Sequence, residues 1–205
     1  MWVLKSRQPA HRRGVGLQRR VKRARKPLSG LAGIREDTRH EQFFFDDSTV
    51  IRLLELLEVA RDPLLVCLPS IALALAERSR PARLLDRDRR FHGLPRASNF
   101  DLHRPDFIEG QHDFLMCDPP FANVSLPTLR NTLDLLVASA MAPAPDPCLG
   151  IAYISSREPQ LLRAFSGYAL RPVGPPLGYR SVAQATQDRI RLYLSKGART
   201  ACGQP

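Results

Sequence analysis

The sequence lacks several features that would assign it to particular classes of protein. No uncharged stretch reaches the length of a membrane-spanning helix, so we expect a soluble protein. The first residues contain no long apolar core of the kind that secretory signals have. No two of the four cysteines lie two to four residues apart, which argues against a zinc site. Cys67 and Cys117 lie in apolar runs and are interpreted as small core residues, which fits a reducing compartment.

Acidic residues are absent from the first 35 positions, although these contain eleven lysines and arginines. The other 170 residues contain 20 basic and 20 acidic side chains, so the net charge of +11 belongs to the N-terminal segment. We predict that residues 1–40 form a disordered basic arm, because like charges repel and few apolar residues can join a core. Such an arm is typical of an RNA contact, a nuclear signal or a mitochondrial transit peptide. We expect a cytoplasmic protein, with a nuclear or mitochondrial location as the alternatives.

Apolar runs alternate with helical spacings over residues 41–196, a length that suits one domain. Five runs are interpreted as strands, at residues 64–68, 83–86, 97–101, 114–117 and 149–154. Strands and helices in alternation predict an α/β fold whose mostly parallel sheet is covered on both faces. Two late runs, 168–173 and 190–194, are separated by a Pro/Gly-rich stretch and predict an antiparallel hairpin at one edge. We expect residues 197–205 to be a disordered tail.

Acidic residues stand at the ends of three predicted strands, at Asp86, Asp101 and Asp118. In open parallel sheets, ligands bind outside the carboxyl ends of the strands. An acid after the second strand typically accepts hydrogen bonds from ribose hydroxyls, so Asp86 is a candidate nucleotide-binding residue, with Asp88 assisting it. The alternative for Asp86 is a helix N-cap or a solvated acid. Asp101 is a candidate acceptor for an adenine amino group, or else a turn residue.

The most informative segment is Asp118-Pro119-Pro120-Phe121, which follows the apolar strand 114–117. The two prolines stiffen the turn, since each fixes φ and lacks an N–H. A carboxylate and a neighbouring backbone carbonyl can then accept the hydrogens of a weakly nucleophilic amino group and align it for methyl transfer. Phe121 offers a flat face for a base or an alkyl amine. The alternative is a rigid turn with an incidental acid.

Glycine is missing from the loop after the first strand, Cys67-Leu68-Pro69-Ser70. Loops that bind nucleotide cofactors usually contain glycines, because these let the backbone approach the ligand. Pro69 and Ser70 can open the next helix and leave its first amides available to a ligand. The missing glycines also keep a non-catalytic RNA-binding or scaffold protein open as an alternative.

In combination, these segments resemble the family of probable N6-adenine methyltransferases, over roughly residues 41–194. The family includes a lysine methyltransferase of a translation elongation factor and a zinc-finger ribosomal-RNA adenine methyltransferase. The matching segments, in family order, are 42–46, 67–70, 85–91, 99–101 and 118–121.

The resemblance implies a Rossmann-like class I methyltransferase fold with a seven-stranded sheet and S-adenosylmethionine as the methyl donor. It implies that Asp86 binds the ribose and Asp101 the adenine region of this cofactor. Residues 118–121 would hold the acceptor nitrogen. The remaining residues expected at the cofactor are Gln42, Phe43, Phe45, Cys67, Pro69, Ser70 and Asp88. Arg87 stands where the family has an apolar or aromatic residue against the adenine, and its guanidinium could stack there instead.

Two acceptors suit the Asp-Pro-Pro-Phe turn. Adenine in RNA or DNA is favoured by Phe121 as a stacking surface and by the basic arm. A lysine of a translation factor is favoured by the compact neutral domain, which has no appended nucleic-acid module. A lysine site must also promote loss of the ammonium proton, which acid-rich walls around Asp118 would do. We favour adenine, and expect a monomer.

Overall fold

The computed structural model describes residues 34–36, 42–80 and 82–204. The predicted basic arm therefore lies outside the described residues, except for the short segment 34–36. This segment contacts the domain: Ile34 packs against the core, and a carboxylate oxygen of Glu36 accepts a hydrogen bond from the Phe44 amide at 2.6 Å. The ordered domain thus includes residues that we had assigned to the arm.

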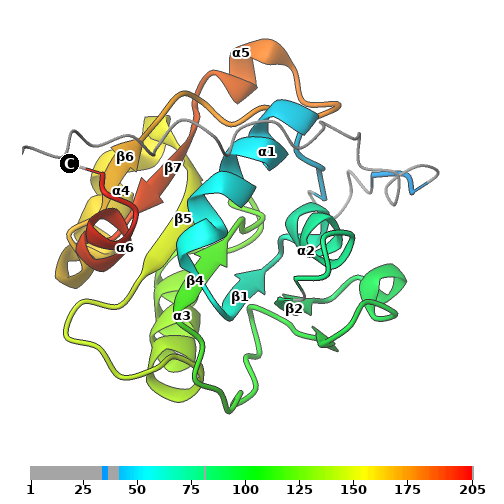
Figure 1. Ribbon diagram of the computed structural model, residues 1–205. Coiled ribbons are helices and arrows are strands. Elements are labelled where there is room, and N and C mark those ends of the chain that lie inside the picture. Colours follow the sequence, from blue (N-terminus) through cyan, green and yellow to red (C-terminus); the bar gives the residue numbers. More distant parts are fainter. Residues whose placement is uncertain (1–33, 37–41, 81, 205) are drawn as a thin grey trace, which may run out of the picture.

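The described residues form one seven-stranded sheet with the order β3-β2-β1-β4-β5-β7-β6 (Figure 1). Strands β1 to β5 are parallel, whereas β7 pairs antiparallel with both β5 and β6. The predicted α/β class and antiparallel edge are confirmed. The strands are β1 Pro63–Val66, β2 Arg83–Asp86, β3 Ala97–Asn99, β4 Phe114–Cys117, β5 Leu149–Ile154, β6 Arg171–Val173 and β7 Ile190–Leu194.

Helices cover both faces of the sheet. They are α1 Asp47–Leu56, α2 Pro69–Ala76, α3 Leu126–Ala140, α4 Glu158–Ala164, α5 Gln184–Gln187 and α6 Lys196–Ala201. Within the part of the chain that the structure describes, no helix combines the length and hydrophobicity that a membrane span requires.

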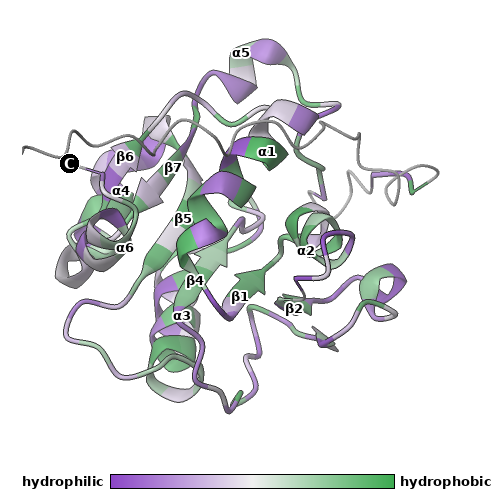
Figure 2. Cartoon of the chain, in the orientation of Figure 1, coloured by the Kyte–Doolittle hydropathy of each residue, from purple (hydrophilic) through white to green (hydrophobic). Residues whose placement is uncertain are grey.

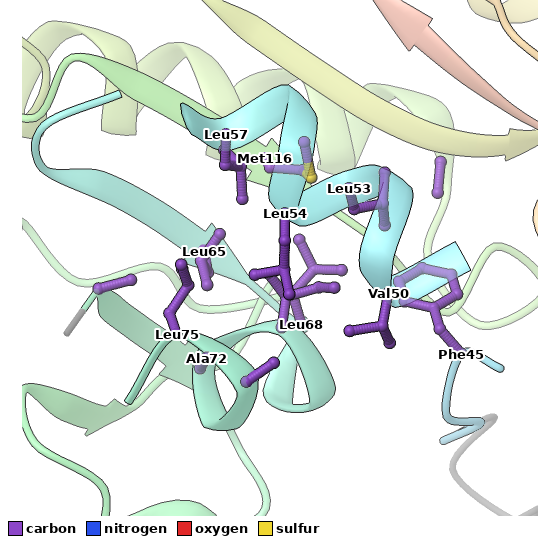
Figure 3. Close-up of a cluster of buried hydrophobic side chains, with 14 of the residues drawn as sticks. Phe45, Val50, Leu53, Leu54, Leu57, Leu65, Leu68, Ala72, Leu75 and Met116 are labelled. Atoms are coloured by element: carbon purple, nitrogen blue, oxygen red, sulfur yellow. The ribbon is translucent and has the colours of Figure 1, made fainter. Parts of the chain in front are cut away.

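The core is divided by the sheet into two clusters, because successive side chains of a strand point to opposite faces. Leu65 and Met116 belong to the cluster beneath α1 and α2, which Figure 3 shows in close-up. Val66 and Cys117, one residue further along the same strands, belong to the cluster beneath α3 and α4. Figure 2 shows the resulting pattern of hydrophobic strands inside helices with polar outer surfaces.

The N-terminus of α1 is fixed by the Asp46 side chain, whose Oδ1 accepts a hydrogen bond from the Thr49 amide at 2.7 Å. A side-chain acceptor at this position satisfies one of the amides that a helix leaves unpaired. Gly178 packs closely against the same cap, and its carbonyl accepts a hydrogen bond from the Asp46 amide at 3.0 Å. The start of α1 is thereby joined to a loop far away in sequence.

Four predicted boundaries were wrong. The first strand, expected at 64–68, ends at Val66, because Cys67 leaves the extended conformation with a φ of 57°. The expected disordered tail begins with a helix, α6, whose Ala198 and Arg199 are buried. The strand expected from residue 168 begins only at Arg171, because residues 166–168 form a 3-10 turn and Ala169 has a left-handed φ of 48°. The third strand ends at Asn99, so Asp101 lies two residues beyond it.

Candidate functional site

A cavity of about 650 Å³ lies at the carboxyl ends of β1, β2 and β4. This is the position at which open parallel sheets bind ligands. Most of the residues that we predicted for the site line it: Gln42, Phe43, Cys67, Pro69, Asp86, Asp88, Asp101, Asp118 and Pro120. The structure therefore brings together candidates from five separate segments of the sequence.

Four predicted site residues are not part of the cavity lining. Phe45 and Ser70 are buried, and so is Pro119. Phe121 is half-buried, and its ring packs edge-on against Tyr153 with the centroids 5.8 Å apart. Its carbonyl accepts a hydrogen bond from Arg157 at 3.0 Å. In this arrangement Phe121 supports the turn, and a stacking role for its ring stays a prediction.

Asp86 is a buried carboxylate at the end of β2. Only 6% of the residue is exposed, and its Oδ1 accepts a hydrogen bond from the Asp88 amide at 2.8 Å. Burial disfavours the charged form and raises the pKa of Asp86 to about 6. The buried Asp86 carboxylate can accept hydrogen bonds from the hydroxyl groups of a ligand, which then take the place of the water that burial removes.

Asp88 belongs to a network with Gln42 and Arg90. Gln42 Nε2 donates to Asp88 Oδ2 at 2.6 Å. Arg90 donates to the same carboxylate at 2.7 Å and also to Oε1 of the Gln42 side chain. Burial alone would raise the pKa of Asp88, but the hydrogen bonds from Arg90 and Gln42 outweigh it and lower this pKa. Since Arg90 also donates to the Arg35 carbonyl, the network attaches the segment before α1 to the cavity rim.

Cys67 takes the place of the glycine that was missing from the first loop. Its backbone has a φ of 57°, in the left-handed region that normally favours glycine. The charges of Asp86, Asp101 and Asp118 all act on its thiol, which places the three strand-end acids around one point. Burial, reinforced by these charges, raises the pKa of Cys67 well above its usual value, so the thiol stays protonated.

Asp118 accepts a hydrogen bond at its Oδ1 from the Tyr179 hydroxyl, at 3.0 Å. Sequence reasoning missed Tyr179, which lies in the stretch between β6 and β7. The Tyr179 ring is buried and packs against Phe45, with the ring centroids 4.7 Å apart. No sequence signal indicated this contact, because 61 positions separate Tyr179 from Asp118.

The turn after Asp118 is closed by its own backbone. The Pro120 carbonyl accepts hydrogen bonds from the amides of Asn123 and Val124, at 2.9 and 3.0 Å. That carbonyl is therefore engaged within the turn.

A family model described as "Probable N6-adenine methyltransferase" matches residues 36–158, which is more than half of the chain. The chain belongs to this family. The segments that suggested the resemblance all lie in the matched range. Among curated proteins, none matches the chain significantly.

Several solved structures are similar to this member of the probable N6-adenine methyltransferase family. Magnesium protoporphyrin IX methyltransferase from Synechocystis PCC 6803, solved with bound SAM, is 14% identical, with a TM-score of 0.50 over 73% of this chain and 76% of that one. The Thermoplasma acidophilum protein 1320 is 18% identical, with a TM-score of 0.47 over 76% and 88%. The Escherichia coli putative methyltransferase yhhF is 21% identical, with a TM-score of 0.42 over 73% and 87%.

Family and fold make this protein a methyltransferase that uses S-adenosylmethionine. The cavity fits this cofactor: its volume suits a ligand of drug size, and Asp86 stands where a ribose needs an acceptor. Cys67, which lines the cavity, has a left-handed backbone conformation of the kind that favours glycine. Among the described residues, no group of His, Cys, Asp and Glu side chains could hold a metal ion.

Proposed function

We propose that this methyltransferase acts on the N6 amino group of adenine in RNA or DNA. The observation that carries the proposal is that Asp118 and Pro120 line the same cavity as Asp86. An acceptor amine held by the turn would then lie in the cavity that Asp86 provides for the cofactor. Nucleic acid as the partner rests also on the basic arm, which lies outside the described residues.

The chain's own residues would hold and align the amine. When bound, S-adenosylmethionine supplies an electrophilic methyl group on its sulfonium sulfur. Asp118 would accept one amino hydrogen, and a backbone carbonyl of the stiff turn would accept the other. Both bonds draw the amino nitrogen out of conjugation with its ring and fix its direction of approach. Phe43 and Val124 supply apolar lining that excludes water from the cavity.

Charged side chains of both signs line the cavity that contains Asp118. Its acids Asp86 and Asp101 would suit a lysine acceptor, whose ammonium must lose a proton before it can attack. The arginines of the cavity favour a nucleic acid instead. Arg87 and Arg89 line the cavity and are exposed, and no ion pair involves either of them within the described residues. Two exposed guanidiniums at the rim suit a polyanion.

Lysine of a translation factor is the second candidate function. Phe43 lines the cavity beside Asp118, and an aromatic face can hold the alkyl chain of an amine. The third alternative, a non-catalytic RNA-binding protein, was motivated by the glycine-poor loop. The match to a family of methyltransferases is the observation against it.

Radiolabelled methyl transfer onto total cell extract tests the substrate class. Parallel samples are treated with ribonuclease, deoxyribonuclease or protease after labelling. We expect one of the two nucleases to erase the label and protease to leave it. Label that survives both nucleases and disappears with protease would establish lysine or another protein acceptor instead.

Asp118→Ala tests the turn itself. We expect methyl transfer to fall by about 100-fold or more, the usual effect of removing one positioned polar group from an active site. S-adenosylmethionine binding, measured by isothermal titration, should change little, because the contacts of Asp118 are to the acceptor. The matched control is Asp134→Ala, which removes a carboxylate bonded to the Tyr168 hydroxyl at 2.6 Å, away from the cavity lining. Full turnover by Asp118→Ala would refute its role.

A further inference from the structure

The loop between β6 and β7 is fastened to the segment before α1. The Phe45 and Tyr179 backbones form an antiparallel bridge, and the Arg180 amide donates to the Phe44 carbonyl at 2.9 Å. On the other side of Tyr179, the Gly178 amide donates to the Thr49 hydroxyl at 2.8 Å. These bonds hold three successive residues of the loop against the start of the domain.

Gln187 fixes the same residue from within the loop. Its Oε1 accepts a hydrogen bond from the Tyr179 amide at 3.1 Å, and its Nε2 donates to the Tyr179 carbonyl at 2.9 Å. Both backbone groups of Tyr179 are therefore bonded to one side chain, while its ring packs on Phe45. A side chain so constrained can direct its hydroxyl at one partner, and that partner is Asp118 Oδ1.

We propose that Tyr179 is a positioning residue for methyl transfer, which fixes the rotamer of the Asp118 carboxylate and keeps it ionised to receive the acceptor amine. The proposal rests on the proposed function of the Asp-Pro-Pro-Phe turn. It adds to the acceptor site a residue between β6 and β7, whereas residues 118–121 directly follow β4.

The chemistry of the pair supports this role. Burial, together with the charge of Asp118, raises the pKa of Tyr179 well above its usual value, so the hydroxyl keeps its proton and donates it. A hydrogen bond donated to a carboxylate favours the charged form. A carboxylate has about four acceptor sites, so one bond from a tyrosine does not exhaust its capacity for an amine.

The titratable groups around Asp118 include Asp86 and Asp101, which line the same cavity and whose charges oppose a further negative charge there. The thiols of Cys67 and Cys117 both feel the Asp118 charge. Burial raises the pKa of each well above its usual value, so both stay neutral. The hydroxyl of Tyr179 donates a hydrogen bond to Asp118 that stabilises the carboxylate charge.

Tyr179→Phe tests the proposal, because it removes the hydroxyl and keeps the ring that packs on Phe45. We expect kcat to fall about 10- to 100-fold, as for a lost hydrogen bond to a charged group, with the Kd for S-adenosylmethionine unchanged. The matched control is Tyr168→Phe, which also removes a tyrosine–aspartate hydrogen bond but outside the cavity lining. A merely structural role would lower Tm in both variants and kcat in neither.

A second readout does not depend on turnover. We expect the carboxyl carbon of Asp118, followed by ¹³C NMR, to titrate at higher pH in Tyr179→Phe than in the unaltered protein. With 3-fluorotyrosine at position 179, a stronger donor of the same shape, the titration should move to lower pH. This variant also serves if Tyr179→Phe fails to fold.

The two readouts separate two kinds of failure. If the unaltered protein methylates no amine, the proposed function is wrong, and the NMR titration still decides whether Tyr179 controls the Asp118 charge. If the protein is active and Tyr179→Phe matches its kcat and its Asp118 titration, the positioning role is overturned.

Discussion

The buried carboxylate of Asp86 has opposite effects on stability and on ligand binding. Its pKa is about 6 in the folded protein and 3.8 as a model value, so the folded state binds its proton more tightly than the unfolded state does. Stability from this group is therefore complete below about pH 4, and is lost as the pH rises through 6. At neutral pH a charged, desolvated group is retained at the place where a ribose is expected.

Asp86→Asn should consequently stabilise the protein at pH 7.5. The gain should approach about 3 kcal/mol, since each of roughly two pKa units corresponds to about 1.4 kcal/mol. Near pH 4 the gain should fall below about 1 kcal/mol, because Asp86 is then almost fully protonated in the folded state and close to half protonated in the unfolded state. Urea unfolding at the two pH values measures this difference. The exposed Asp106, changed to Asn, is the control.

The same variant should bind S-adenosylmethionine more weakly, because an amide oxygen replaces a charge-assisted acceptor. Isothermal titration at pH 7.5 measures this loss alongside the gain in stability. An equal change in unfolding free energy at pH 4 and pH 7.5 would show that the Asp86 charge is not the cause.

Individual site residues were predictable where a local pattern placed them. Asp86 and Asp118 follow apolar runs of strand length, and the rule that ligands bind at strand ends was enough to group them. Tyr179 was not predictable, because its partner is 61 positions away and two strands, β5 and β6, lie between them in the sequence. Cys67 was interpreted as a core residue, since a sequence does not reveal a left-handed φ in a residue other than glycine.

Among the elements, strands were the easiest to locate. Buried strands read as continuous apolar runs, and β2, β4, β5 and β7 have the bounds that we expected. The helix α6 was missed because its sequence, KGARTA, has no apolar periodicity. It is held by tertiary contacts: Arg199 is buried and donates to the carbonyls of Ala169 and Leu194, at 2.8 and 2.9 Å.

The contact between α1 and the loop before β7 requires glycine at position 178. A Cβ added there would lie 2.1 Å from Asp46 Oδ2, the side chain that caps α1. Gly178→Ala should therefore displace the cap and move Tyr179. We expect a loss of about 1–3 kcal/mol of stability, the usual cost of overpacking, and reduced methyl transfer.

Gly167→Ala is the matched control, because nothing lies within 4 Å of a Cβ added at that glycine. Thermal and urea unfolding of both variants, with methyl-transfer assays, provide the comparison. If Gly178→Ala unfolds like the unaltered protein and retains full turnover, the loop does not depend on this close contact.

At the scale of the whole molecule, charge and fold are separated along the sequence. Residues 36–205 carry as many acidic as basic side chains, whereas the first 35 residues are exclusively basic. The cavity is lined by residues from Gln42 onward. Cofactor binding and polyanion binding should therefore be separable by removing the first segment of the chain.

Deleting residues 1–33 removes ten of the lysines and arginines and leaves a protein with a formal charge of +1. We expect it to bind single-stranded RNA more weakly and with a flatter salt dependence. Each phosphate that a protein neutralises on a single strand contributes about 0.7 to the slope of log K against log salt, so the slope should fall by several units. Filter binding between about 50 and 200 mM salt measures the slope. S-adenosylmethionine affinity should be unchanged.

A full-length variant with the same ten residues changed to Gln distinguishes charge from length, and should behave like the deletion. An unaltered salt slope in both proteins would assign RNA contact to the domain itself and leave the arm a role in targeting.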